Sequence, residues 1–347
     1  MKIAIIGSGM MGSALAFPAV YNGHQVALIG TILDDDIITA CKTTNKHPKF
    51  EKAFPTGVTY HYFNEWKTAI NGASFIICGV SSFGVDWFLE NVLSDPACNL
   101  PVLSVTKGLI CQGDGTLISY PDYWNIQLAK KGIKREICAI GGPCTSYELV
   151  FGDKTEVAFC GENENTLKTM KNALKTPYYN ISLTKDIIGL ESAVALKNGY
   201  ALGVALTIGL VEKEFGETAG LHYNSQAGVF YQATKEMKKL MAIQKGSGNA
   251  YFIGVGDLYV TVYGGRTRLV GILLGKGLTI TEALDKLKGV TLESLVVAKR
   301  VAKAIRIKAE KGEVDINDFP LLMHVDDIVS NGVTAEIPWD KFTFEDL

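Results

Sequence analysis

A glycine pattern near the start of the chain constrains the fold more than any other feature. The stretch IAIIGSGMMGSALA places Gly7, Gly9 and Gly12 directly after an apolar strand and at the start of a helix. In the G-x-G-x-x-G turn of Rossmann folds the first glycine allows a tight turn, the second admits a pyrophosphate, and the third lets helix and strand pack closely. We therefore predict a dinucleotide site at this turn, with Met10 and Met11 beside the phosphates.

The rest of the first half of the sequence alternates between short apolar runs and stretches with helical spacing. The helical stretches include Gly12–Tyr21, Asp34–Thr43, Val85–Leu93 and Asn165–Leu174. Continuous apolar strands that alternate with helices are typical of a parallel sheet covered on both faces. The candidate strands are Ile3–Ile6, Gln25–Ile29, Val58–Tyr62, Ser74–Gly79, Val102–Val105, Ile137–Ile140, Glu156–Cys160 and Tyr178–Leu183.

From about Asp186 the strand pattern stops and long helical windows follow. Thr279 and Glu282 in TITE have the spacing of a helix-capping box. We predict an α/β fold in two domains: an N-terminal Rossmann-type doubly wound parallel sheet over residues 1–185, which binds the dinucleotide, and an all-α C-terminal domain over residues 186–347, which carries substrate binding and catalysis. The helical windows are Gly189–Phe215, Gln226–Ile243, Ala250–Val262, Thr279–Lys288 and Thr291–Glu310.

Charge and cysteine content exclude several classes of partner and site. With 34 basic and 36 acidic side chains and a net charge of −2, neither nucleic acid nor an acidic membrane surface is expected as a partner. The N-terminus lacks the pattern of a secretory signal. Lys197, Asn198 and glycines interrupt the apolar residues 193–210, which favours a soluble core helix over a membrane span. The seven cysteines form no CxxC pair and no cluster with histidines, which favours reduced thiols in the cytoplasm and no metal.

The end of the second strand bears on the choice between NAD and NADP. An acidic residue normally ends this strand in NAD-binding Rossmann folds, whereas an arginine accommodates the 2′-phosphate of NADP. Here the strand runs VALIGT, ending near Thr31, and the first acids, Asp34 to Asp36, come later. Neither NAD nor NADP is excluded, and the pattern favours NADP or dual use slightly.

A lysine inside an apolar segment indicates chemistry in the second half of the chain. Lys197 lies in AVALKNGYALGVALTIGL, and burying an ammonium is costly unless it is paired. Lys107 in SVTKGL follows a strand, at the edge where ligands bind in open α/β sheets. Asp257 and Thr261 lie one helical turn apart, before a glycine pair and Arg266. Two lysines, an arginine and a hydrogen-bonding Asp/Thr pair point to an anionic substrate with an oxygen to polarise.

The order of these motifs resembles one family of dehydrogenases. TKG, ALKN and GDL-x2-T-x2-GGR follow one another as in the NAD(P)-dependent glycerol-3-phosphate dehydrogenases, and NSQAGVFYQATKEM and VTLESL extend the resemblance over nearly the whole chain. The resemblance implies an oxidoreductase of glycerophospholipid metabolism that acts on a CH–OH group. It would interconvert dihydroxyacetone phosphate and sn-glycerol 3-phosphate with NAD or NADP, more often as a reductase. A cytoplasmic homodimer is expected.

The same resemblance assigns roles to individual residues. Lys197 corresponds to the general acid/base, Lys107 to a second active-site lysine, and Asp257 is the candidate partner of Lys197. One position departs from the family pattern, because Thr267 stands where an asparagine usually follows the arginine, which affects the grip on phosphate. The substrate-binding residues would be Asn198, Thr261, Arg266, Thr267, Gly142, Cys144 and Ser146, and the cofactor-binding residues Gly7, Gly9, Met10, Met11, Gly12, Thr31, Phe83, Lys107, Arg266 and Glu293.

Two other functions stay open at this point. Other reductases pair a Rossmann half with a helical half and a lysine, including those that act on 3-hydroxy acids or ketopantoate, but they lack the GDL…T…GGR block. The chain could instead be a nucleotide sensor without catalysis. A sensor has no need for a proton donor, which argues against this alternative given the joint presence of Lys107, Lys197, Asp257, Thr261 and Arg266.

Overall fold

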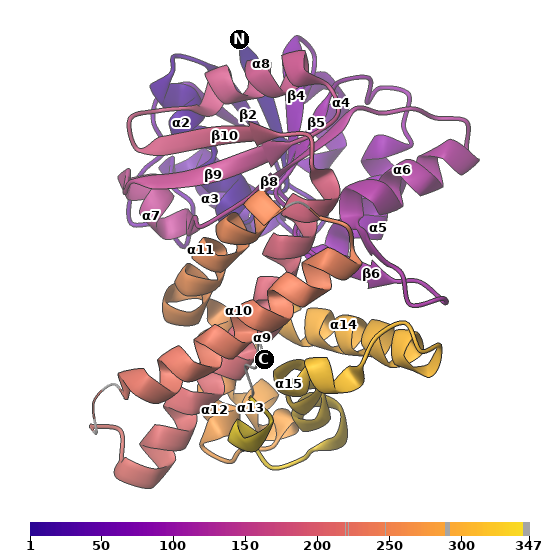
Figure 1. Cartoon of the computed structure of the whole chain (residues 1–347). Coiled ribbons are helices and arrows are strands. Elements are labelled where there is room, and N and C mark those ends of the chain that lie inside the picture. The colour runs from indigo at the N-terminus through magenta and orange to yellow at the C-terminus, as the bar shows by residue number, and fades with distance from the viewer. Residues whose placement is uncertain (219, 221, 247, 289–291, 343–347) are drawn as a thin grey trace. The chain divides into compact units, whose positions relative to one another are not determined.

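A computed structural model of the chain describes residues 1–347 except 219, 221, 247, 289–291 and 343–347. The chain forms two compact units, which are coloured by residue number in Figure 1. The first unit comprises Met1–Lys107 and Tyr120–Ile187, and the second comprises Gly108–Ser119 and Ile188–Leu347. A short segment from the first half of the sequence therefore belongs to the second unit.

The first unit is built on an eight-stranded sheet in the order β10-β9-β8-β5-β4-β1-β2-β3. Every residue from Ile3 to Ile6 in β1 is buried, so helices or loops cover both faces of the sheet at its centre. Each predicted strand is present to within one or two residues at its ends. The strands are β1 Lys2–Ile6, β2 Gln25–Ile29, β3 Val58–His61, β4 Ala73–Cys78, β5 Val102–Ser104, β8 Ile137–Gly141, β9 Thr155–Cys160 and β10 Tyr179–Thr184.

The predicted doubly wound α/β fold is confirmed, with one difference in strand direction. β9 pairs antiparallel with β8, and β10 pairs parallel with β9, so these two strands run opposite to the others. The connection from β8 to β9 contains only the six-residue helix α7 (Ser146–Phe151). It lacks the long packed helix that usually crosses the sheet between two parallel strands. The expectation of an entirely parallel sheet is therefore wrong at this edge.

The helices of the first unit follow the predicted alternation, with three additions. The predicted helix at 85–93 is α-helical at first and closes as a π-helical turn over Leu89–Leu93. The helices α4, α6 and α7 were not predicted. The remaining helices are α1 Met10–Ala14, α2 Ala16–Tyr21, α3 Asp35–Thr44, α4 Trp66–Ala69, α5 Val85–Phe88, α6 Tyr120–Lys130 and α8 Glu164–Leu174.

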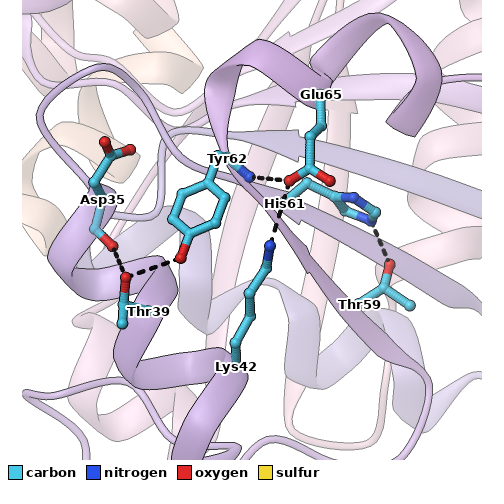
Figure 2. Close-up of polar contacts among 7 residues, drawn as sticks. All are labelled: Asp35, Thr39, Lys42, Thr59, His61, Tyr62 and Glu65. Carbon is cyan, nitrogen blue, oxygen red and sulfur yellow. Dashed lines mark hydrogen bonds and ion pairs between the residues drawn. The ribbon is translucent and has the colours of Figure 1, made fainter.

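Polar contacts join α3 to the segment that follows the edge strand β3 (Figure 2). The Thr39 hydroxyl donates to the Asp35 carbonyl at 2.8 Å and lies 3.0 Å from the Tyr62 hydroxyl. Lys42 Nζ lies 3.3 Å from Glu65 Oε2, and the same oxygen accepts the Tyr62 N–H. Each exposed contact contributes little alone. Together they connect α3 with Tyr62 and Glu65, which follow β3.

The second unit is helical, apart from one hairpin. β6 (Leu109–Cys111) and β7 (Leu117–Ser119) pair antiparallel. Lys311 donates to the Asp114 carbonyl at 2.7 Å and Arg300 to the Leu109 carbonyl at 3.0 Å, which holds the hairpin against α14. The helices are α9 Ile187–Phe215, α10 Tyr223–Ile243, α11 Gly248–Gly264, α12 Arg266–Gly275, α13 Ile280–Lys286, α14 Glu293–Glu310 and α15 Pro320–Asn331.

Most of these helices match the predicted windows. The capping box at Thr279 is present, because its hydroxyl accepts the Glu282 N–H while the Glu282 carboxylate accepts the Thr279 N–H. The helices α12 and α15 were not predicted. By length and composition α9 could cross a membrane, but 83% of its apolar window is buried within the protein. It therefore has the character of a core helix.

Glycines let α9 approach α12 at backbone distance. A Cβ atom at Gly209 would lie 2.1 Å from the Ile272 carbonyl oxygen, and one at Gly275 would lie 2.3 Å from the Leu206 oxygen. Any larger residue at these positions would force the two helices apart. The glycines that interrupt the apolar α9 sequence are thus packing positions.

A buried carboxylate on α10 caps the start of α15. Glu236 is fully buried, and its two oxygens accept the N–H groups of Leu321 at 2.8 Å and Leu322 at 3.0 Å. These are among the first N–H groups of α15, which have no partner inside the helix. Gln232 Nε2 also donates to Glu236 at 2.8 Å. Burial nevertheless raises the pKa of the Glu236 carboxyl to about 7.

This raised pKa predicts an unusual dependence of stability on pH. An unfolded glutamate ionises near 4.5, so between that pH and about 7 the folded protein holds a proton that the unfolded chain has lost. The contribution of Glu236 to the free energy of unfolding should then fall by roughly 1–3 kcal/mol as pH rises from about 5 to about 8. Urea unfolding across this range should show that Glu236→Gln removes the decline.

The control for this prediction is Lys238→Ala, which changes an exposed residue on the same helix. Its unfolding curve should follow the wild-type dependence on pH. Equal slopes for the wild type and Glu236→Gln would contradict the assignment.

Candidate active site

Close packing of α11 on α9 sets the position of the two central side chains of the second unit. A Cβ atom at Gly254 would lie 2.7 Å from Cβ of Ala193, so at this point the helices touch almost backbone to backbone. One turn further along each helix stand Asp257 on α11 and Lys197 on α9. Residues one turn apart lie on the same face of a helix, so the close contact directs these two side chains toward each other.

Lys197 and Asp257 form a buried ion pair. Lys197 Nζ donates to Asp257 Oδ1. The Asp257 side chain is 0% exposed and that of Lys197 is 10% exposed. A charge buried this deeply requires a partner, and the carboxylate supplies it. The lysine in the apolar segment is therefore neither on a solvated face nor unpaired.

Polar neighbours of this pair come from the same two helices. Asn198 follows Lys197 on α9 and is buried. Thr261 is also buried, and its hydroxyl donates to the Asp257 carbonyl at 2.7 Å, which leaves the hydroxyl oxygen able to accept a further hydrogen bond. The Asp/Thr pair is thus linked through the backbone of α11.

A sharp break separates α11 from the arginine that follows it. A Cβ atom at Gly265 would lie 2.5 Å from the Thr261 carbonyl oxygen, so only glycine fits there. Arg266 is exposed as the first residue of α12, and Thr267 beside it is buried. Glu293 begins α14 and is partly exposed.

The glycine-rich turn of the first unit has the geometry that a dinucleotide requires. Gly7 has φ +103°, and a Cβ atom there would lie 2.6 Å from the Gly79 carbonyl carbon. A Cβ atom at Gly12 would lie 2.4 Å from the Gly7 carbonyl oxygen, so α1 can pack closely only because this residue is glycine. Around Gly9 the nearest atom would be 3.7 Å away, which leaves space beside the start of α1. The residues present fit a dinucleotide pyrophosphate.

Two loops after strands of this sheet lie side by side. Lys107 follows β5, and its Nζ donates to the Gly142 carbonyl at 3.4 Å. Gly142 follows β8, with φ +135°, and leads to Cys144, which is partly exposed. Ser146 is the first residue of α7. The structure therefore brings together Lys107 and the GGP loop, as their positions at strand ends predict.

An acidic side chain lies at the end of β2, although its residue comes several positions after the strand in the sequence. Asp34 lies beyond the strand, but its Oδ2 accepts the Thr31 N–H at 2.8 Å and the Thr31 hydroxyl at 2.9 Å. The chain turns back so that this carboxylate lies at the strand end. The spacing of Thr31 and Asp34 was the only signal in the sequence. Phe83, the other expected cofactor contact in this unit, is exposed.

Comparisons with known proteins identify the family. The family model described as the NAD-dependent glycerol-3-phosphate dehydrogenase N-terminus matches residues 2–185, and the corresponding C-terminus model matches residues 186–339. The chain belongs to the NAD-dependent glycerol-3-phosphate dehydrogenase family. The resemblance predicted from the motifs is thereby confirmed.

Individual relatives agree with this assignment. The NADP(+)-dependent glycerol-3-phosphate dehydrogenase of Archaeoglobus fulgidus is 31% identical over 89% of this chain and 90% of its own length. The NAD(P)+ enzyme of Geobacter sp. (strain M21) is 26% identical over 83% of this chain and 82% of its own length. Since the relatives' names include both cofactors, NAD(P) dependence is a property of this family.

Solved structures show that the fold is shared. The glycerol-3-phosphate dehydrogenase of Coxiella burnetii superimposes with a TM-score of 0.79 at 22% identity and covers 98% of this chain and 97% of its own. That of Plasmodium falciparum has a TM-score of 0.81 at 19% identity, covering 100% and 96%. A ketopantoate reductase from Ralstonia eutropha has a TM-score of only 0.56. The fold therefore agrees better with the dehydrogenase family than with this rival.

Among the described residues, no group of three or more His, Cys, Asp and Glu side chains could hold a metal ion. The predicted cationic side chains are Lys107, in the first unit, and Lys197 and Arg266, in the second.

The buried ion pair predicts how substitutions affect stability. Lys197→Met should lower the free energy of unfolding by about 3–5 kcal/mol, because it leaves the Asp257 carboxylate buried without its ammonium. Asp257→Leu should destabilise similarly. The double variant should recover to within about 1–2 kcal/mol of the wild type, since a buried pair can often be replaced by apolar residues. Urea unfolding of all four proteins measures the coupling, and strictly additive losses would contradict a direct pair.

Proposed function

We propose that this chain catalyses the NAD(P)H-dependent reduction of dihydroxyacetone phosphate to sn-glycerol 3-phosphate, and the reverse oxidation. The observation that carries the proposal is the buried pair of Lys197 and Asp257 in a chain of this family. A buried lysine held by a carboxylate can exchange a proton with a substrate oxygen. A nucleotide sensor would have no use for such a group.

Lys197 acts as the general acid and base. The bound nicotinamide supplies the hydride to C2 of the substrate or accepts it. In reduction Lys197 donates a proton to the C2 oxygen as negative charge develops there, and in oxidation it removes that proton. Asp257 holds the ammonium in one orientation through the hydrogen bond to Oδ1. Such a proton transfer typically contributes about 10²–10⁴ in rate.

The other polar residues bind and orient the substrate. Lys107 stabilises the developing alkoxide, and Arg266 binds the phosphate through charge-assisted hydrogen bonds. The exposure of Arg266 at the start of α12 supports this role, because a ligand can reach the side chain there. The remaining substrate contacts are Asn198, Thr261, Thr267, Gly142, Cys144 and Ser146.

The cofactor contacts come from both parts of the sequence. Residues 1–185 form the dinucleotide-binding domain, and residues 186–347 form the substrate and catalytic domain. Asp34 at the end of β2 does not decide between NAD and NADP by itself, because its Oδ2 is engaged by Thr31. The proposed contacts are Gly7, Gly9, Met10, Met11, Gly12, Thr31, Phe83, Lys107, Arg266 and Glu293.

Location and assembly complete the proposal. A reducing cytoplasm fits the seven cysteines, none of which forms a disulfide. The homodimer rests on the resemblance to the family.

The activity can be tested directly with the purified protein. Absorbance of NADH or NADPH should fall when dihydroxyacetone phosphate is added, and unphosphorylated dihydroxyacetone should be a poor substrate. Ketopantoate and 3-oxo acids serve as controls for the rival reductases. Turnover of these compounds in preference to dihydroxyacetone phosphate would contradict the proposal.

Lys197→Met tests the proton donor. Because the variant keeps the apolar stem but loses the proton, kcat should fall by about 10²–10⁴. NAD(P)H affinity, measured by fluorescence titration, should stay near that of the wild type. The matched control is Lys213→Met, an exposed lysine on the same helix, which should keep full turnover. Near-normal turnover in a folded Lys197→Met protein would refute the mechanism.

Arg266→Ala tests phosphate recognition. Loss of charge-assisted hydrogen bonds worth about 1.5–3 kcal/mol each should lower kcat/KM for dihydroxyacetone phosphate by about tenfold to a hundredfold. Activity toward dihydroxyacetone should change much less. Arg268→Ala, two residues further along α12, serves as the control and should keep its efficiency. An equal loss with both substrates would show that Arg266 does not bind the phosphate.

A further inference from the structure

The peptide groups of Ser8, in the centre of the glycine-rich turn, are held by side chains from three other places. The Ser8 N–H donates to Asp34 Oδ2 at 3.1 Å. The Ser8 carbonyl lies 3.1 Å from His47 Nε2 and accepts the Ser13 hydroxyl at 3.0 Å. Ser8 and His47 are both buried, at 0% and 1% exposure. Both ends of this residue's backbone are therefore anchored.

The hydrogen bonds determine which nitrogen of His47 carries the proton. His47 Nδ1 accepts the N–H of Lys49 at 3.0 Å, so Nδ1 carries no hydrogen. Nε2 must then be the protonated nitrogen, and it donates to the Ser8 carbonyl, which can only accept. Burial lowers the pKa of His47, which favours this neutral form. The imidazole thus acts as a fixed hydrogen-bond donor to the Ser8 carbonyl.

The loop that carries His47 is itself held in place. Asn45 ends α3 with φ 55°, and its Nδ2 donates to the Phe54 carbonyl at 2.8 Å. Phe54 returns its N–H to the Asn45 carbonyl at 2.8 Å. The ring of Phe50 lies 4.6 Å from the His47 ring. His47 therefore contacts Ser8 from a closed loop rather than from a free side chain on the surface.

Asp34 holds the other peptide group of Ser8, the one between Gly7 and Ser8. Its Oδ2 accepts three donors, the N–H of Ser8, the N–H of Thr31 and the hydroxyl of Thr31. One carboxylate oxygen thus connects the turn after β1 with the end of β2. Charge-assisted bonds of this kind are stronger than neutral ones.

Anchoring matters here because the neighbouring glycines give the turn little rigidity of its own. Gly7 and Gly9 flank Ser8, and glycine loses more conformational freedom on folding than any other residue. The orientation of the two peptide groups that flank Ser8 decides where the chain enters α1 and so where the first N–H groups of that helix point. A rotated peptide would misplace the groups that face the pyrophosphate.

We propose that His47 and Asp34 are positioning residues that hold the two peptide groups flanking Ser8 in the orientation that the dinucleotide requires. Neither residue is in the motifs that indicated the function, and neither is assigned here to the hydride or proton transfer. The proposal rests on the dinucleotide site of the proposed function and adds the residues that shape it. Removing either side chain should weaken NAD(P)H binding and leave the chemical step unchanged.

The decisive experiment measures binding and turnover in His47→Ala and His47→Gln. In His47→Ala the Kd for NADH or NADPH, from fluorescence titration, should rise about three- to tenfold, as expected for one net hydrogen bond. The KM for the cofactor should rise in parallel, while kcat and the KM for dihydroxyacetone phosphate should stay within about twofold. His47→Gln retains an N–H donor near the position of Nε2 and should recover most of the affinity.

A matched control separates positioning from general loss of stability. Phe50→Leu removes the ring that packs on His47 but keeps the hydrogen bond to Ser8, so it should lower the Tm without changing the Kd. Asp34→Ala should raise the Kd as His47→Ala does, whereas Asp36→Ala, an exposed acid on α3, should leave it unchanged.

Three outcomes would overturn the proposal. These are an unchanged Kd in His47→Ala, an equal rise in Phe50→Leu, or a failure of His47→Gln to recover affinity. Failure of the proposed function would be distinct, because the wild type itself would then bind no dinucleotide or reduce no dihydroxyacetone phosphate.

Discussion

The buried pair of Lys197 and Asp257 is the interaction on which the helical unit depends. Two charges removed from water are tolerated only in a fixed geometry, so α9 and α11 must pack in one register. Gly254 lets α11 approach Ala193 on α9, and Gly209 and Gly275 let α9 and α12 approach equally closely. Packing and the proposed proton chemistry therefore depend on the same helix contacts, and a substitution at the pair should affect both stability and turnover.

In the first unit, backbone groups of the glycine-rich turn are proposed to bind the anionic cofactor. The glycines of this unit remove side chains where the turn, α1 and β4 meet, and a Cβ atom at Gly79 would lie 2.6 Å from the Gly7 carbonyl oxygen. Glycines leave space for close contacts but do not make the backbone rigid. Rigidity comes from elsewhere, since Asp34 and His47, in segments that follow β2 and α3, hold the two peptide groups that flank Ser8. Each unit thus combines close backbone contacts at glycines with one or two buried or partly buried polar side chains that fix the geometry.

Sequence reasoning located most strands and the long helices because their apolar runs are continuous. It failed where local pattern and tertiary context disagree. The reversed β9 looks like any buried strand, since a strand pattern carries no direction, and α15 begins at Pro320 with a cap supplied by Glu236. The motif residues were found by their order along the chain. His47 was not predicted, because nothing near it in sequence indicates that it contacts Ser8.

Local order along the chain was sufficient to establish the Rossmann and helical halves, the glycine turn and the family, because each depends on residues close together or on motif spacing. Other features depended on the folded chain. The β6–β7 hairpin joins the second unit through Arg300 and Lys311, and Glu236 reaches Leu321 across 85 residues. The Asp34 carboxylate lies at the end of β2, although Asp34 comes several residues after this strand in the sequence. Such contacts join residues far apart or reverse the direction of the chain, and no periodicity in sequence records them.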